Sequence, residues 1–292
     1  MAEALVVCRF LQFNAAMFLV GTSTFLWWLV PGRLHQEAER PLWRLSVLAI
    51  LVAAVTTVAW LLLETGQIAG GWGDMLDPDT LSGVLFDTSF GQAWVWRLLL
   101  AVLLLACLAL PRRRRWQALA LASGLFLASL GLVGHATIND GVLGIGHRLN
   151  HAVHLLAAAM WVGALVPLWV CLRLGRKATH EADLATVLRR FSGSGHMAVA
   201  LVLLSGIVDT YLVLGHAPLD FSSPYQTLLA AKIALVGFMV LIAIVNRYVV
   251  VPRQARGESS GLRMLVRGTI AEIVLGGVVI AIVSAFATFD PR

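Results

Sequence analysis

The segment 134–163 contains four of the eight histidines, and their spacing points to metal chemistry. If a helix begins near His147, then His147, His151 and His154 follow at i, i+4 and i+7, within an arc of about 60° on one face. Neutral imidazole is the commonest transition-metal ligand. One ion cannot bridge i and i+7, which lie about 10 Å apart along a helix, but it can bridge i and i+3 or i and i+4. His151 and His154 therefore form the core of a predicted site, and a neighbouring helix supplies a third donor. The candidate ligands are His135, His147, His151, His154 and His216.

The same histidines permit a second chemistry, axial ligation of a b-type haem between two facing helices. That arrangement needs two imidazoles at equal depth on opposite helices, such as His151 against His135 or His216. No second matched pair stands out toward the other membrane face, which disfavours a two-haem path across the membrane. Hydrolytic and nucleotide-driven activities find no support, because the sequence has no GxSxG, HExxH or phosphate-cradling motif.

The composition places these histidines in a membrane protein. Apolar residues make up 59% of the chain and charged residues only 13%, which is unlike a water-soluble domain. We expect an all-α, polytopic integral membrane protein with a single domain over residues 1–292. Apolar runs of about 20 residues mark bilayer spans. They predict eight transmembrane helices, at roughly 4–30, 43–65, 92–110, 116–134, 147–172, 191–214, 226–250 and 264–286.

The basic residues predict the orientation of these helices. Of the 22 lysines and arginines, 17 fall in or beside alternate connections, near residues 33–44, 112–115, 173–190 and 247–267. By the positive-inside rule this side is cytoplasmic, so both termini are extracytoplasmic and the histidine cluster faces outward. This sorting also argues that the net charge of +6 orients the chain in a lipid bilayer and does not bind nucleic acid.

Ionisable residues inside spanning helices are costly and mark functional groups or pairs. Two acids and two bases occur near the predicted outer boundary, which suggests the pairs Asp209 with Lys232 and Glu64 with Arg97. The alternative is that the two bases extend independently to the outer surface.

Glu272 lies about 13 Å along the last helix from Arg263, close to the bilayer midplane. His196, entering from the same side, is its candidate partner. The two residues would either relay protons or cations inward or tie two helices together.

Three sequence stretches carry a family resemblance: HRLNHAVHLLAAAMWVGAL, RRFSGSGHMAVALVLLSGI and YQTLLAAKIALVGFMVLIAIVNRYVVVP, followed by the Glu272 segment. Together they resemble the copper resistance protein D (CopD) family of bacterial inner-membrane proteins. The resemblance implies a multi-pass inner-membrane location, copper as the transported ion and a periplasmic copper carrier of the CopC type as partner. It also implies that His135, His147, His151 and His154 are copper ligands.

The leading hypothesis is a transporter that takes copper up through the outer histidine site. Imidazole and carboxylate donors suit Cu(II) better than Cu(I). The competing hypothesis is a haem-binding redox protein that uses the same histidines, for example to reduce copper. A third is an assembly partner for periplasmic metal proteins, without catalytic activity.

Overall fold

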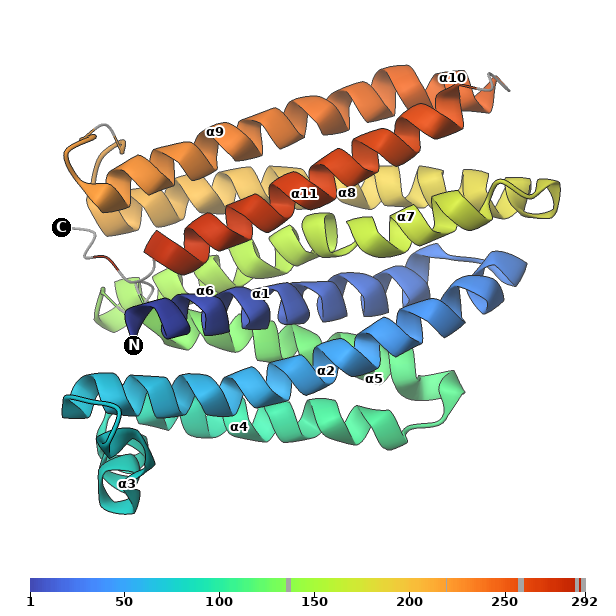
Figure 1. Cartoon of the computed structure of the whole chain (residues 1–292). Coiled ribbons are helices and arrows are strands. Elements are labelled where there is room, and N and C mark those ends of the chain that lie inside the picture. Colours follow the sequence, from blue (N-terminus) through green and yellow to red (C-terminus); the bar gives the residue numbers. More distant parts are fainter. Residues whose placement is uncertain (135–137, 219, 257–259, 287–288, 290–292) are drawn as a thin grey trace.

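A computed structural model describes residues 1–134, 138–218, 220–256, 260–286 and 289. Every regular element in these residues is helical, which confirms the predicted all-α class. Most of the long helices run back and forth along one axis and form an elongated bundle (Figure 1). The apolar composition accounts for this architecture, since a helix satisfies its backbone hydrogen bonds internally and can remain in hydrocarbon.

The longer helices are α1 (Ala2–Thr24), α2 (Gly32–Ala69), α3 (Pro78–Asp87), α4 (Ser89–Ala106), α5 (Arg112–Ala128), α6 (Gly141–Ala158), α7 (Leu165–Leu174), α8 (Glu181–Leu214), α9 (Pro224–Val245) and α11 (Gly261–Phe286). Three π-helical segments extend or join them: η1 (Phe25–Leu29), η6 (Ala159–Gly163) and η8 (Asn246–Val250). The short elements are η2 (Asp74–Leu76), η3 (Cys107–Ala109), η4 (Ser129–Leu132), η7 (Ala178–His180) and α10 (Val251–Ala255).

The bundle has two chemically different ends (Figure 1). At one end α1 begins, α6 begins and α8 and α11 finish; we call it the histidine end. At the other, α4 passes into α5 and α7 into α8; we call it the arginine end, because the basic segments near residues 33–44, 112–115, 173–190 and 247–267 lie there. The separation follows the charge pattern of the sequence.

By length and apolar composition, seven helices in the described part of the chain could cross a membrane. They begin with α1, α2, α4, α6, α8, α9 and α11. The helix α5, which opens with four arginines, is not one of the seven, although it packs against α1, α4 and α6.

Several helices are longer than the apolar runs from which they were predicted. Residues 32–42 and 181–190, expected in cytoplasmic connections, are the first turns of α2 and α8. The predicted outer loop also contains a helix, α3, whose first turn is capped by Asp77. Hydropathy marks only the apolar part of a helix, whereas arginine, lysine and glutamate are good helix formers and extend it further.

The helix α1 lies in the middle of the bundle and contacts α2, α5, η6 and α11. It crosses η6 with backbone against backbone, at Gly21 and Gly163. A Cβ atom on Gly21 would overlap the backbone of Gly163, and one on Gly163 would overlap the carbonyl of Met17. The Trp161-Val162-Gly163 motif therefore provides the close crossing that holds α6 and α7 against the central helix.

Ion pairs fasten α2 to its neighbours at the arginine end. Arg115 of α5 donates to the Glu39 carboxylate, and the Lys177 ammonium lies 2.8 Å from Glu37. The Nε2 atom of His180 is 3.0 Å from the same Glu37 carboxylate. These contacts are structural ties between helices, so His180 has a role without any metal.

Candidate functional site

The helix α6 directs three histidines toward α8. His147, His151 and His154 recur at helical spacing, and α6 packs along α8 over this length. His147 is 1% exposed and His154 is 9% exposed, whereas the His151 side chain is 32% exposed. The three imidazoles thus occupy a common interface, with His151 the most accessible.

Asp209 of α8 is the hydrogen-bond acceptor for polar side chains of α6. Its Oδ2 atom lies 2.9 Å from Nδ1 of His151, and its Oδ1 accepts a 2.6 Å hydrogen bond from the Asn150 amide. Nε2 of His147 is 3.8 Å from Oδ1. The Asn150 amide also donates to the carbonyl of Ser205, which fixes the rotation of α6 against α8.

The contact with Asp209 determines which nitrogen of His151 is available to a ligand. An ionised carboxylate only accepts hydrogen bonds, so Nδ1 of His151 carries the proton and donates it. Nε2 then has a free lone pair. Metal-binding histidines commonly donate their second nitrogen to a carboxylate in this way, which orients the ring and raises its basicity. His151 has the form expected of a metal ligand.

Ser205 prepares His154 similarly. Its hydroxyl donates to the Leu201 carbonyl at 2.5 Å and lies 3.0 Å from Nδ1 of His154. Because a hydroxyl has one hydrogen, the imidazole must be the donor in the second contact. Nε2 of His154 is therefore also unprotonated. The missing side chain of Gly206 makes room for this ring, since a Cβ there would be 3.2 Å from Cε1 of His154.

His147 has a different role in this arrangement. Its Nδ1 accepts a 3.0 Å hydrogen bond from the Asn139 amide, which also donates to the Leu212 carbonyl. Nε2 then carries the proton and points toward Asp209. Both ring nitrogens have protein partners, so His147 positions the carboxylate and offers no free lone pair.

The predicted set of three ligands is not assembled in the described residues. No group of three His, Cys, Asp or Glu side chains there is placed to hold one metal ion. His151 and His154 have nearly parallel rings, with centroids 6.4 Å apart. His216 is exposed and bonded to the carbonyl of its neighbour Ala217, and His135 lies outside the described residues. The physical reason is that α8 presents Asp209 and Ser205 to these two histidines and adds no third imidazole.

The buried charges near this end pair differently from the prediction. The expected contact between Glu64 and Arg97 is wrong. Glu64 of α2 lies 3.8 Å from Arg9 of α1 and accepts a hydrogen bond from Trp60. Arg97 is fully buried and donates to the Ser129 hydroxyl at 2.8 Å. The antiparallel packing of α1 and α2 brings Arg9 to Glu64. Arg9 lies inside the first predicted span, but hydropathy does not show which neighbouring helix it faces.

Lys232 of α9 lies beside the cluster without a direct contact to it. Its ammonium interacts electrostatically with Asp209 and lies 5.9 Å from the ring of Phe286. The direct partners of Asp209 are instead His151 and Asn150. The predicted pairing of Lys232 with Asp209 is therefore a longer-range attraction.

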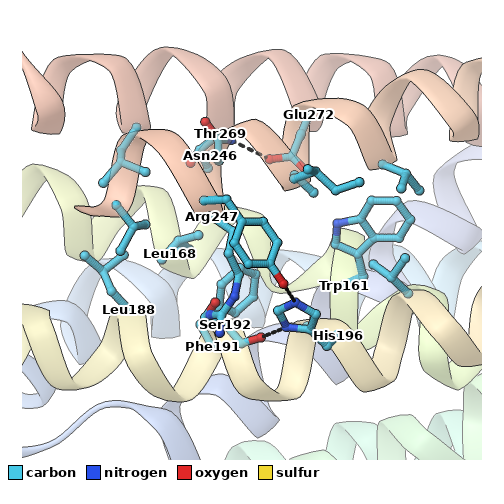
Figure 2. Close-up of a pocket in the computed structure, with 18 of the residues that line it drawn as sticks. Trp161, Leu168, Leu188, Phe191, Ser192, His196, Asn246, Arg247, Thr269 and Glu272 are labelled. Carbon is cyan, nitrogen blue, oxygen red and sulfur yellow. Dashed lines mark hydrogen bonds between the residues drawn. The ribbon is translucent and has the colours of Figure 1, made fainter. Parts of the chain in front are cut away.

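His196 and Glu272 line one cavity in the half of the bundle toward the arginine end, from opposite walls (Figure 2). Each has its own partner. His196 lies 3.1 Å from the Tyr248 hydroxyl, and Glu272 accepts a 3.1 Å hydrogen bond from Asn246. The structure brings the two predicted residues to the same space without joining them.

Sequence reasoning missed three supporting residues: Arg9, Asn139 and Ser205. A signal existed for Ser205, which precedes Asp209 by four residues and so shares its face of α8. Asn139 had no such signal, because it lies outside any helix and reaches His147 only through the fold.

The surface of the histidine end is acidic. Hydrogen bonds from Thr80 lower the pKa of Asp77, and hydrogen bonds from Ser222 lower the pKa of Asp220. Both carboxylates therefore remain ionised in mildly acidic solution, and they attract cations toward this end.

Two family models match the chain: "Copper resistance protein D-like, N-terminal domain" over residues 1–145 and "Copper resistance protein D" over residues 185–286. Inner membrane protein YebZ of Escherichia coli (strain K12) is 36% identical over 288 residues, 98% of each chain. Copper resistance protein D of Pseudomonas syringae pv. tomato is 26% identical over 302 residues, 98% of this chain and 96% of that protein.

Copper transport protein CutJ of Bacillus subtilis (strain 168) is 26% identical over 265 residues, 87% of this chain and 48% of that protein. No solved structure matches the chain. The similarity to YebZ and to Copper resistance protein D extends over nearly the whole sequence and agrees with the two family models. The chain therefore belongs to the copper resistance protein D family.

Proposed function

We propose that this protein takes copper up across the bacterial inner membrane through His151 and His154 at the histidine end, with Asp209 holding the His151 ring in position. The observation that carries the proposal is the hydrogen bond from His151 to Asp209, which leaves Nε2 of an accessible imidazole free to bind metal. His154 offers a second free nitrogen one turn deeper. A cation entering at His151 would thus meet the next donor on its way into the bundle.

We further propose that α5 is an eighth membrane span. It has α1, α4 and α6 as neighbours, which would place its length inside the bilayer. Its four arginines would then lie at the cytoplasmic surface, with the histidine end and both termini outside. A periplasmic copper carrier of the CopC type would deliver its ion at this acidic end.

Reporter fusions test this topology. A reporter active only outside the cytoplasm should be active after residue 140 and inactive after residue 110. Equal activity at the two fusion points would show that α5 does not cross the membrane, and would leave the copper site to be tested separately.

The central experiment measures copper bound to the purified full-length protein. The wild type should retain Cu(II) through gel filtration, and the double variant His151→Ala/His154→Ala should lose it. His216→Ala is the matched control, because His216 lies in the connection that follows α8 at the same end and is bonded only to its neighbour among the described contacts. Uptake of copper into right-side-out vesicles should be equal for the wild type and His216→Ala and should be lost in the double variant. Equal uptake by wild type and double variant would refute the proposal.

The haem alternative is tested by the absorption spectrum of the same preparation. A haem held between helices needs an imidazole opposite those of α6. Within the described residues, α8 presents Asp209 and Ser205 to these histidines instead. A Soret band that disappears in the double variant would nevertheless establish the redox function in place of transport.

A further inference from the structure

A second site is indicated by the cavity that contains His196 and Glu272, remote from the histidine end. The cavity has a volume of about 460 Å³ and is bounded by α7, α8, α9, η8 and α11. Most of its wall is aliphatic, with side chains such as Leu168, Leu188 and Val240. Small-molecule sites have this size and this apolar lining, with a few polar groups that orient the ligand.

The cavity opens on the side of the bundle, between helices that are apolar enough to cross a membrane. The helix α9 packs mainly along α11, and α8 packs mainly along α6, so α8 and α9 are not closely packed over their length. Leu203, Ile244 and Tyr248 line the cavity from α8, α9 and η8 and are also exposed on the outer surface of the bundle. All three belong to helices apolar enough to cross a membrane. A ligand from the bilayer could therefore enter between α8 and α9.

The polar groups stand on two facing walls (Figure 2). On one wall, Nδ1 of His196 donates to the Ser192 carbonyl, so Nε2 accepts from the Tyr248 hydroxyl at 3.1 Å. The Tyr248 oxygen keeps a lone pair for another donor. On the other wall, Oε2 of Glu272 accepts from Asn246.

The second carboxyl oxygen of Glu272 lacks a well-formed hydrogen bond. The Trp161 indole approaches this carboxylate, but the Oε1 atom is buried without a hydrogen-bond partner of normal geometry among the described residues. The whole residue is only 4% exposed, and Nε of Arg247, which also lines the cavity, is likewise buried and unpartnered there. Buried polar atoms are rarely left unsatisfied, because burial removes the hydrogen bonds that water would otherwise make to them. A ligand in the cavity would supply the missing partner.

Two of the three π-helical segments in the described residues also border this cavity. The segment η6 contributes Trp161, and η8 contributes Asn246 and Tyr248. A π-helical turn is less favourable than an α-helical one and occurs frequently at functional sites, where it redirects side chains. The wide turns here direct an indole, an amide and a phenol toward one space.

We propose that this cavity binds a lipid-soluble quinone in its reduced, quinol form. A quinol head is flat and carries one hydroxyl group on each of two opposite sides of its ring. One hydroxyl would donate to Glu272 and the other to the Tyr248 oxygen, while the ring lies near the indole of Trp161. Its hydrocarbon tail would leave through the opening between α8 and α9. The proposal concerns binding alone and does not depend on the copper site.

Quinone bound to the purified full-length protein in phosphatidylcholine nanodiscs tests this assignment. Ubiquinol is supplied under anaerobic conditions, and the quinone extracted from the wild type, counted after oxidation, should be nearly stoichiometric. Glu272→Ala should reduce it by about tenfold, the loss expected for one buried hydrogen bond. Ala243→Trp should also remove it, because Ala243 lines the cavity and an indole there would fill the space.

Val274→Trp is the matched control, since Val274 is exposed on α11 and does not line the cavity. This variant should retain quinone. Equal quinone in all four proteins, quinone no higher than in empty nanodiscs, or phospholipid alone in the extract would each overturn the proposal. Copper binding is measured on the same samples. If the wild type holds quinone but binds no copper, only the transport function is refuted.

Discussion

Nδ1 of His151 lies 2.9 Å from Oδ2 of Asp209, across the interface between α6 and α8. The two residues are 58 positions apart in the chain. This contact identifies the site, because Nδ1 of the His151 imidazole is hydrogen-bonded to the carboxylate and Nε2 is left free to bind a ligand. It also makes the carboxylate the organising group, since Asn150 and His147 are directed at it as well.

Replacing Asp209 with asparagine should weaken copper binding by about 10–100-fold, the usual loss when the carboxylate behind a metal-binding histidine is removed. The asparagine side chain is not a charged acceptor for Nδ1–H of His151. The His151 ring therefore loses its fixed tautomer and orientation. Titration of the purified protein with Cu(II) measures the change. Asp220→Asn is the control, because Asp220 is exposed at the same end and bonded to Ser222. An equal loss in both variants would point to surface charge instead.

Gly206→Ala should disturb His154 without removing it. The added methyl group would lie 3.2 Å from Cε1 of the imidazole, so the ring must shift and its bond to Ser205 must lengthen. We expect copper affinity to fall by about tenfold, equivalent to 1.4 kcal/mol. Gly193→Ala on the same helix meets no atom within 4 Å and should bind copper normally. Normal binding by both variants would show that His154 is not a ligand.

Gly163→Ala should destabilise the bundle, because the new Cβ would overlap the Met17 carbonyl where α1 crosses η6. Overpacking of this kind costs about 1–3 kcal/mol. A lower midpoint of thermal unfolding in detergent would reveal it. Gly277→Ala on α11 has open space around its Cβ and should unfold at the wild-type temperature. An unchanged midpoint for Gly163→Ala would mean that the two backbones are not in contact.

Glu64→Gln should also be destabilising, since it leaves the Arg9 charge without its partner among the described contacts. An unpaired buried donor costs about 1–3 kcal/mol. The double variant Arg9→Met/Glu64→Gln should lose less stability than the sum of the single changes, as coupled residues do. Simple additivity would contradict the pair, and coupling between Glu64 and Arg97 would restore the arrangement expected from sequence.

Copper binding should weaken as the solution is acidified from pH 7.5 to 5.5. Imidazole binds metal only in its neutral form, so protons compete with copper for a site whose donors are imidazole nitrogens. Asp77 and Asp220 do not account for this change, because their lowered pKa values keep them ionised across the range. Isothermal titration at several pH values, with release of protons at the lower ones, checks the sign. Affinity independent of pH would contradict copper binding through an accessible imidazole.

The sequence alone determined what depends on local order. Apolar runs and helical periodicity predicted an all-α protein, and seven of its helices in the described residues are confirmed as long and apolar enough to span a membrane. The same periodicity placed His147, His151 and His154 on one face, because helix geometry is set within a few neighbouring residues. Family membership also followed from motifs within this local pattern.

The partner of each polar side chain depends on how the helices pack. Asp209 meets His151 and Asn150, and Glu64 meets Arg9, because helix packing brings distant turns to the same depth and rotation. Hydropathy records the depth of a residue only approximately and says nothing of which neighbour it faces. One helical residue turns a side chain by about 100°, so a small change in rotation selects a different contact. Helix packing therefore determines which ring nitrogen of His147, His151 and His154 has a protein partner and which is free.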